Sequence, residues 1–291
     1  MSKIIDGRKI AEEIQNELKQ KVKELKNRGV TPQLATVLVG ESPASLSYLR
    51  RIQKSFGAVG ISTDVFKLPK NVTQEELEKK IAEISRDSRI HGILLQMPLP
   101  KHIDVTEVSE VINPNKDIDC INPLNVGLFL LGNPRFIPCT PLAVCEILRR
   151  SGYDLKGKEV VVVGAAGRVG RLTTLLLIKN WATVTACDIA TRDLANHTRN
   201  AEILISAVGK PRLITADMVA EGAVVIDIGV SRVEDPERPG KFKLVGDVDF
   251  DAVKEKVSAI TPVPGGVGPV TTAMLISNTV KAAEMIEGLR S

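Results

Sequence analysis

The chain has 291 residues, long enough for two domains that each have a core. Hydrophobic residues make up 43% and charged residues 25%, which is typical of a soluble globular protein. A net charge of +4 without a long basic run, together with only 3% aromatic residues, argues against nucleic-acid binding and against a membrane-surface role.

The cysteines and the first residues indicate a cytoplasmic protein. The four cysteines have neither metal-site spacing nor a CxxC pair, so we expect reduced thiols and no metal site. These cysteines are Cys120, Cys139, Cys145 and Cys187. Charged residues near the start lead us to expect no signal peptide, and no apolar run reaches membrane-spanning length.

The first 112 residues alternate between helical and strand patterns. Helix-start signals occur at Ser42-Pro43, at Thr73 to Glu76 and at Asp104 to Glu107, and Gly29 marks a helix end. The predicted helices cover 10–28, 42–58, 73–84 and 104–112, and the predicted strands cover 34–39, 61–68 and 92–96. Strands joined by helix-length crossovers predict a parallel sheet.

A second α/β region follows a predicted helix over 140–150. Its predicted strands cover 159–163, 182–187, 202–206 and 224–228, with helices over 172–178, from 191 and near 215, and a last helix over 270–289. We therefore predict two three-layer α/β domains with a cleft between them, the second a Rossmann-like doubly wound parallel sheet. The first domain would comprise 1–140 plus 270–291, and the second 141–269.

A glycine-rich turn is the main functional signal of the second region. Gly164, Gly167 and Gly170 lie between a strand of valines and a helix, and such a turn presents backbone N–H groups to a diphosphate. The spacing is G-x-x-G-x-x-G rather than G-x-G-x-x-G, so a tight turn without a ligand is the alternative. Asp188 follows the next strand, where an acid that binds ribose is expected.

Three further stretches are unusual. Gln96 ends a buried strand before the turn Met97-Pro-Leu-Pro100, and Lys116 to Asp119 places two acids in one loop. Residues 261–269 contain three prolines and three glycines, which fix an irregular backbone. Each stretch alone is explained by a rigid connection, but together with a dinucleotide site they indicate a cleft between domains.

The motifs resemble those of the methylenetetrahydrofolate dehydrogenase/methenyltetrahydrofolate cyclohydrolase family. They follow the family's order and spacing along nearly the whole chain. The matching stretches are Pro43-Ala-Ser-x-x-Tyr48, Gly92-Ile-Leu-Leu-Gln-Met-Pro-Leu-Pro100, Lys116-Asp-Ile-Asp119, Pro138-Cys-Thr-Pro141, Ala207-Val-Gly-Lys-Pro211, Gly246-Asp-Val248 and Ile260-Thr-Pro-Val-Pro-Gly-Gly-Val-Gly-Pro269.

The resemblance implies a folate substrate between the domains, a nicotinamide cofactor on the second domain, and a homodimer. Tyr48 would stack on or hydrogen-bond to the folate, Gln96 would contact the reacting one-carbon region, and Asp119 would accept the pterin N–H groups. The alternatives without a ligand-binding role are an aromatic residue of the core at Tyr48 and an acid that stabilises a turn at Asp119. The pocket lining would be completed by Leu99, Pro264, Gly265 and Gly268.

One departure from the family concerns the cyclohydrolase reaction. The family's helix reads Tyr-x-x-x-Lys with a lysine associated with that reaction, whereas Ile52 stands at its place here. Arg51 lies about 60° from Tyr48 around the helix and can lean towards the folate, but arginine stays protonated and is no general base. Hydride transfer needs alignment, while hydrolysis needs an acid or base, so we predict a dehydrogenase whose cyclohydrolase activity is weak or lost.

A second departure concerns the dinucleotide. The family commonly has Gly-Arg-Ser in the turn and His-Ser or a base after the next strand, whereas this chain has Ala165-Ala166 and Asp188-Ile189. An acid repels a 2′-phosphate and accepts from a ribose hydroxyl, so we predict NAD over NADP, unless Arg168 or Arg192 swings in. The predicted cofactor-binding residues are Gly164, Ala165, Ala166, Gly167, Gly170, Asp188, Ile189 and Val230.

Two other functions are compatible with parts of this pattern. The substitutions in the turn and at position 52 are also expected of a catalytically silent folate- or nucleotide-binding paralogue with a regulatory role. A different two-domain dehydrogenase, such as a shikimate-type enzyme, shares the architecture, but it leaves the 96–100 turn and the 261–269 loop unexplained.

Overall fold

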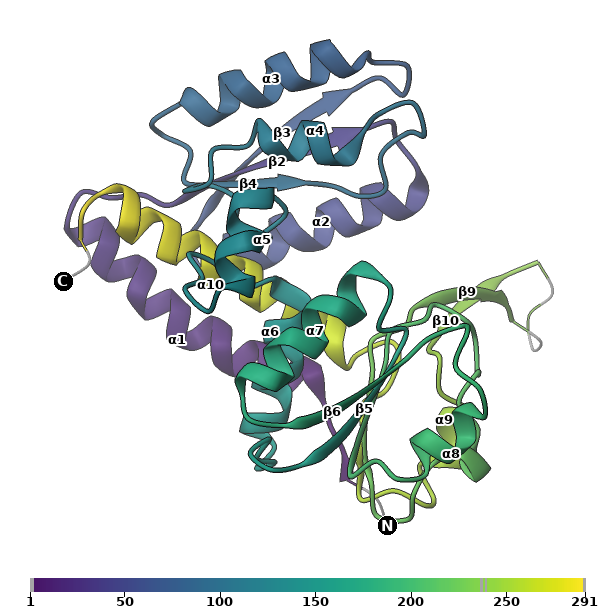
Figure 1. The fold of residues 1–291 in the computed structure, drawn as a ribbon. Helices are drawn as coiled ribbons and strands as arrows, with labels where there is room; N and C mark the ends of the chain where they lie inside the picture. Colours follow the sequence, from purple (N-terminus) through teal and green to yellow (C-terminus); the bar gives the residue numbers. More distant parts are fainter. Residues whose placement is uncertain (1–2, 236–237, 239, 290–291) are drawn as a thin grey trace. The chain divides into compact units, whose positions relative to one another are not determined.

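A computed structural model describes residues 3–235, 238 and 240–289 (Figure 1). The chain divides into two compact units. Unit 1 joins residues 3–11 to Thr140–Thr271, and unit 2 joins Glu12–Cys139 to residues 272–289. Within the described residues, no helix combines the length and the apolar character that crossing a membrane requires.

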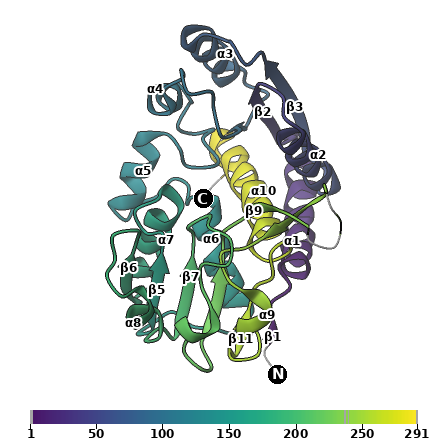
Figure 2. The same cartoon turned by 90° about the vertical axis from the view of Figure 1, so that its right-hand side faces the viewer.

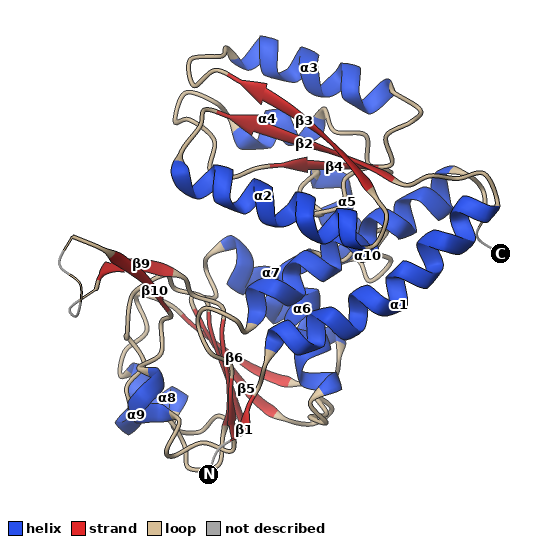
Figure 3. Cartoon of the chain, turned by 180° about the vertical axis from the view of Figure 1, so that it is seen from behind, coloured by secondary structure: helices blue, strands red, loops and turns tan. Residues whose placement is uncertain are grey.

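Unit 2 contains a three-stranded sheet that is parallel, as predicted, and its strands lie in the order β3-β2-β4. Its strands are β2 (Gln33–Val39), β3 (Ser62–Leu68) and β4 (Gly92–Leu95), and its helices include α2 (Pro43–Ala58), α3 (Gln74–Arg86), α4 (Val105–Glu110) and α5 (Pro123–Leu130). Helices α3 and α4 cover one face of the sheet and α2 covers the other (Figure 3). Two long helices, α1 (Gly7–Asn27) and α10 (Val267–Ile286), contribute residues to both units.

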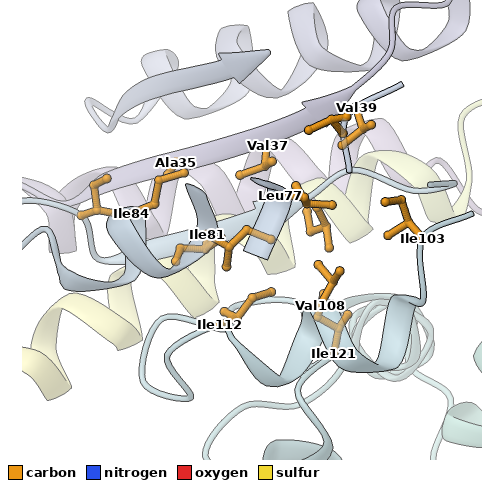
Figure 4. Packing of buried hydrophobic residues seen from close by; sticks show 14 residues of the cluster. Ala35, Val37, Val39, Leu77, Ile81, Ile84, Ile103, Val108, Ile112 and Ile121 are labelled. Carbon is orange, nitrogen blue, oxygen red and sulfur yellow. The ribbon is translucent and has the colours of Figure 1, made fainter. Parts of the chain in front are cut away.

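The core of unit 2 lies between this sheet and helices α3 and α4 (Figure 4). Alternate residues of β2, namely Ala35, Val37 and Val39, meet Leu77 and Ile81 of α3 there. Leu34, Thr36 and Leu38, on the other face of β2, are buried as well, because helices cover both faces of the sheet. This explains why the strand is a nearly continuous apolar run.

The predicted helix starts are confirmed, with one change of partner. Ser42 and Thr73 cap α2 and α3 in reciprocal capping boxes. Asp104 caps α4 by accepting from the Thr106 N–H at 2.7 Å, but its own N–H donates to Gln74 Oε1 at 2.9 Å. The Glu107 carboxylate accepts from the amide of Gln74, so Gln74 takes the role that the sequence assigned to Glu107.

Unit 1 contains a six-stranded parallel sheet in the order β1-β11-β8-β7-β5-β6. Its strands are β1 (Lys3–Ile4), β5 (Glu159–Val163), β6 (Thr183–Cys187), β7 (Ile203–Ser206), β8 (Val224–Asp227) and β11 (Ala259–Ile260). Its helices are α6 (Cys139–Arg150), α7 (Arg168–Lys179), α8 (Leu194–Thr198), α9 (Phe250–Val253) and a short 3-10 helix, η1 (Ala216–Met218). Helices α6 and α7 cover one face of the sheet, and α8 and α9 cover the other (Figure 1 and Figure 2).

The strand order reverses between β5 and β7. From β5 the chain crosses first to β6 on one side and then to β7 on the other. In a doubly wound sheet, ligands bind at the carboxyl ends of the strands beside such a reversal. The glycine turn after β5 and residues 207–209 after β7 both lie at this position.

The structure differs from the predicted domain boundaries and elements at several points. Strand β1 pairs with β11, so residues 3–11 belong to unit 1, whereas the sequence placed them with the first domain. Two-residue strands such as these carry no readable periodicity. The antiparallel hairpin of β9 (Ser231–Glu234) and β10 (Phe242–Val245) and helix α5 were not predicted, and α10 begins at Val267 rather than at 270.

Candidate functional site

A pocket of about 400 Å³ in unit 2 brings together three predicted site residues from distant parts of the sequence. Tyr48 comes from α2, Gln96 follows β4, and Asp119 comes from the loop after α4. The complete lining is Ser42, Ala44, Ser45, Tyr48, Leu94, Leu95, Gln96, Met97, Pro98 and Asp119. Predicted lining residue Leu99 packs instead against the core cluster on the α3 face of the sheet.

The side-chain amide of Gln96 has a hydrogen-bond partner for its nitrogen but none for its oxygen within the described residues. Its side-chain Nε2 donates to the Ser45 carbonyl at 3.0 Å, which fixes the amide against α2. The Oε1 atom is buried and has no hydrogen-bond partner in the described part of the chain. A buried amide oxygen without a donor is unfavourable, so a ligand N–H or O–H in the pocket would satisfy it.

Tyr48 is held as a neutral phenol. Burial raises its pKa, and the carboxylate of Asp119 raises it further. The guanidinium of Arg51 lies over the Tyr48 ring, 5.9 Å from its centre. A neutral phenol can donate a hydrogen bond to a ligand in the pocket.

Ile52 lies on the buried side of α2. Its side chain is 0% exposed, on the same helix face as Leu49 and Phe56. It is not part of the pocket lining given above. A lysine in this environment would have to be desolvated, which lowers the pKa of an amine.

The two acids of the loop 116–119 have different roles. Asp117 is fully buried and accepts from the backbone N–H groups of Ile121 and Asn122 and from the Asn125 amide. It fixes the shape of the loop. Asp119 instead lines the pocket, where its carboxylate can accept two adjacent N–H groups from a ligand.

Two buried residues to which the sequence analysis assigned no role, Asn278 and Cys139, hold the backbone next to Asp119. The Asn278 amide of α10 donates to the carbonyls of Ile118 at 2.7 Å and Ile137 at 3.0 Å, which joins the two loops. The Cys139 thiol donates to the Ile118 carbonyl at 3.3 Å, and its pKa is raised by burial and then by Asp119. The signal for Asn278 is an amide that follows closely on the apolar run Ala273 to Ile276 of the helix.

The predicted glycine turn in unit 1 is built by close backbone approach. Gly164 has φ +89°, and a Cβ there would lie 2.6 Å from the Ala207 carbonyl oxygen. A Cβ on Gly170 would overlap the carbonyl of Gly164. Gly167 precedes α7 without a side-chain cap, so no side chain of the cap residue occupies the first N–H groups of the helix, which are groups of the kind that bind anions.

Asp188 connects the end of β6 to this turn. Its Oδ2 accepts from the Ala166 N–H at 2.6 Å. The N–H groups of Ile189 and Ala166 lower the pKa of the Asp188 carboxyl, so it is ionised at neutral pH. Arg171 binds the Ala166 carbonyl at 2.7 Å, while Arg168 and Arg192 are exposed.

The remaining predicted residues lie in unit 1. Ile189 is 101% exposed and Val230 is 59% exposed, both in loops that follow strands of the sheet. Pro264 and Gly265 belong to the 261–269 loop, where Gly265 has φ +117°, and Gly268 lies in the first turn of α10. It stays a prediction that Pro264, Gly265 and Gly268 line a folate site and that Ile189 and Val230 bind the dinucleotide. Among the described residues, no group of three or more His, Cys, Asp or Glu side chains could hold a metal ion.

A doubly wound parallel sheet with a glycine turn and a strand-end acid at its reversal defines a dinucleotide-binding α/β protein. The chain belongs to the tetrahydrofolate dehydrogenase/cyclohydrolase family. Residues 5–119 match the family's catalytic domain, and residues 138–287 match its NAD(P)-binding domain. Membership decides against the shikimate-type alternative.

Named relatives cover almost the entire chain. The chain is 51% identical over 281 residues to the bifunctional protein FolD of Nautilia profundicola, covering 97% of each. A crystal structure of bifunctional FolD from Campylobacter jejuni has a TM-score of 0.93 at 44% identity, covering 98% of this chain and 99% of that chain. The Trypanosoma brucei dehydrogenase-cyclohydrolase, solved with NADP and an inhibitor, has a TM-score of 0.94 at 41% identity, covering 100% and 99%.

Proposed function

We propose that the protein oxidises 5,10-methylenetetrahydrofolate to 5,10-methenyltetrahydrofolate by transferring a hydride to a nicotinamide dinucleotide. The observation that carries this proposal is the unit 2 pocket, which gathers Tyr48, Gln96 and Asp119 from three separate segments. The names of the relatives support it. Unit 2 would hold the folate and unit 1 the dinucleotide.

Each pocket residue has a role in this reaction. Asp119 accepts the N–H donors of the pterin edge, and Tyr48 packs on or donates to the folate. The unpartnered Oε1 of Gln96 contacts the one-carbon region. Hydride transfer is driven by the lone pair of the adjacent folate nitrogen, so these residues contribute alignment rather than proton transfer. The dinucleotide supplies the hydride acceptor.

For the dinucleotide we propose NAD over NADP. The ionised Asp188 carboxylate lies at the end of β6 and is fixed to the turn by its bond with the Ala166 N–H. A fixed negative charge repels a 2′-phosphate, while its remaining lone pairs accept from ribose hydroxyls. The T. brucei relative was solved with NADP, so the proposed preference for NAD rests on this chain's own residues and not on that relative.

For the second reaction we propose weak or absent cyclohydrolase activity. Hydrolysis of the methenyl cation needs a group that accepts and delivers protons. Burial raises the pKa of Tyr48, an arginine such as Arg51 is not a residue type that serves as a general base, and Ile52 offers no ionisable group at the place of the family's lysine. The curated relatives are named as bifunctional, so the proposal rests on this chain's own residues, above all on Ile52, and not on the comparisons.

Assays of both half-reactions with purified protein test these proposals together. We expect turnover of methylenetetrahydrofolate with a higher kcat/KM for NAD than for NADP. The Ile52→Lys variant should gain cyclohydrolase activity, with Ile52→Met as the control for a long side chain without charge. Equal cyclohydrolase rates in the wild type and Ile52→Lys, at the level of a bifunctional relative, would refute the loss of that activity. Folate binding without turnover would favour the silent paralogue.

We also propose a homodimer. The β9–β10 hairpin of unit 1 exposes Phe242 (53%) and Leu244 (39%), and Val230 (59%) precedes it. Apolar side chains grouped on one exposed segment are typical of an interaction surface. Light scattering of the wild type and of Phe242→Ser/Leu244→Ser tests this, because the substitutions should yield monomers if the hairpin is the interface.

A further inference from the structure

The motif Gly246-Asp-Val248 has no role in the site described so far, yet its acid is part of the dinucleotide edge. Asp247 is 0% exposed. Its Oδ2 accepts from the Ser206 hydroxyl at 2.9 Å and from the Val208 N–H at 2.7 Å. The side chain thus connects the segment after β10 to the end of β7, about 40 residues earlier in the sequence.

The peptide that Asp247 holds is also the one against which the glycine turn packs. A Cβ on Gly164 would lie 2.6 Å from the Ala207 oxygen and 3.1 Å from the Val208 nitrogen. The position of the Ala207–Val208 peptide therefore limits where Gly164 can lie. Gly164 starts the turn before α7. The Ala207–Val208 peptide therefore also limits the positions of the N–H groups that the turn presents.

A second buried acid holds Asp247 in place. The Asp227 carboxylate, at the end of β8, accepts from the backbone N–H groups of Asp247 at 3.1 Å, Val248 at 2.9 Å and Gly229 at 3.0 Å. Glycines make room for both acids, because a Cβ on Gly229 would overlap the Asp247 carboxylate and one on Gly246 would overlap that of Asp227.

Two buried acids side by side are costly to desolvate, and here the cost is only partly offset. Asp247 Oδ1 is buried and has no hydrogen-bond partner within the described ranges. Removing one partner from such an arrangement lowers the free energy of unfolding. The arrangement as a whole adds little stability compared with apolar residues packed in the same space. An arrangement of this kind at a ligand-binding edge indicates that it fixes a geometry.

We propose that Asp247 is a positioning residue for the dinucleotide. It holds the Ala207–Val208 peptide against Gly164, so that the turn before α7 keeps the shape that accepts a diphosphate. Asp227 fixes the backbone from which Asp247 reaches. This inference rests on the proposed function, since it takes the ligand of the turn to be a nicotinamide dinucleotide.

The test compares Asp247→Ala with Asp247→Asn. Asparagine keeps an accepting oxygen for Ser206 and Val208 and places an amide at the oxygen that has no donor. Alanine removes both bonds. The matched control is Asp249→Ala, which removes an acid two residues after Asp247. The Asp249 side chain makes no capping hydrogen bond to α9. The dissociation constant of NAD is measured by calorimetry without folate, well below each variant's melting temperature.

We expect Asp247→Ala to raise the NAD dissociation constant at least tenfold, and Asp247→Asn and Asp249→Ala to stay within threefold of the wild type. The KM for the folate should change less than twofold in all three. Wild-type NAD affinity in Asp247→Ala, equal weakening in the alanine and asparagine variants, or a parallel rise in folate KM would overturn the role. If the wild type binds NAD without oxidising the folate, the proposed function fails while the binding series still decides this inference.

Discussion

The two units hold their candidate binding groups by different means. In unit 2, the side chains of Tyr48, Gln96 and Asp119 line the pocket themselves. In unit 1, the turn offers backbone N–H groups, and its shape depends on close approach at Gly164 and Gly170. A pocket lined by side chains can be predicted from the residue types in the sequence. A site built from backbone N–H groups depends instead on the contacts that fix the backbone, which the sequence does not show.

The supporting acids show the same difference. Asp117 in unit 2 stabilises a single loop through donors four to eight residues away. Asp227 and Asp247 in unit 1 connect segments that lie about 20 and 40 residues apart. We infer that removing Asp117 acts mainly on stability, while disturbing the unit 1 pair acts on ligand binding as well. The predictions below test that contrast.

The largest effect should come from the titration of Asp227. Burial raises its pKa from 3.8 to about 7, against the opposing effect of its N–H donors. An acid with a raised folded-state pKa stabilises the fold below its unfolded pKa, and this stability is lost as pH rises through the folded value. Relative to Asp227→Asn, the wild-type unfolding free energy should fall by up to roughly 4 kcal/mol between pH 4 and pH 7.

Urea denaturation of both proteins at half-unit pH steps measures this. Other carboxyls contribute equally to the two profiles, so the difference between them isolates Asp227. Parallel profiles across this range would show that burial does not raise the pKa of Asp227.

The next effect separates the two acids of the 116–119 loop. Asp117→Ala leaves three buried donors without an acceptor and should lower the unfolding free energy by about 3 kcal/mol. Asp119→Asn should change stability by less than about 1 kcal/mol but weaken folate binding tenfold or more, because a charged acceptor is lost. Denaturation and folate titration of both variants measure the pair. A reversed order, with Asp119→Asn the less stable protein, would contradict the division of roles.

Much of the fold and of the pocket follows from local patterns. The turn acids and the capping residues Ser42 and Thr73 act within a few residues, where spacing is informative. The family motifs supplied Tyr48, Gln96 and Asp119, which the structure brings together. What the sequence could not reveal depends on contacts between distant segments.

Asp247 and Asn278 illustrate this limit. The motif of Asp247 was visible, but its bonds to Ser206 and Val208 exist only because β7, β8 and residues 246–248 meet at one edge of the sheet. Asn278 reaches Ile118 across 160 residues. The pairing of β1 with β11 joins residues still farther apart in the sequence, such as Lys3 and Ala259, through strands too short to carry a pattern.

Glycine substitutions test the claim that the unit 1 turn depends on backbone approach. Gly170→Ala places a methyl group against the Gly164 carbonyl and should cost about 2 kcal/mol of unfolding free energy, with NAD affinity reduced more than tenfold. Gly127→Ala in α5 is the matched control, because a Cβ there meets no atom within 4 Å. It should be neutral or up to about 1 kcal/mol more stable. Similar losses in both variants would mean that helix propensity, rather than close approach, explains Gly170.

The smallest effect concerns the choice of dinucleotide. Asp188→Ser removes the ionised carboxylate at the end of β6 but keeps a hydroxyl for the ribose, so the ratio of kcat/KM for NAD to that for NADP should fall about tenfold, or 1.4 kcal/mol. Asp193→Asn is the matched control: it removes a charge five residues away and suits the left-handed backbone there, at φ 47°. A tenfold fall in both variants would point to the general field of the loop. A fall in Asp188→Ser alone would assign the preference to the acid that also holds the glycine turn, so that one carboxylate shapes the site and selects its ligand.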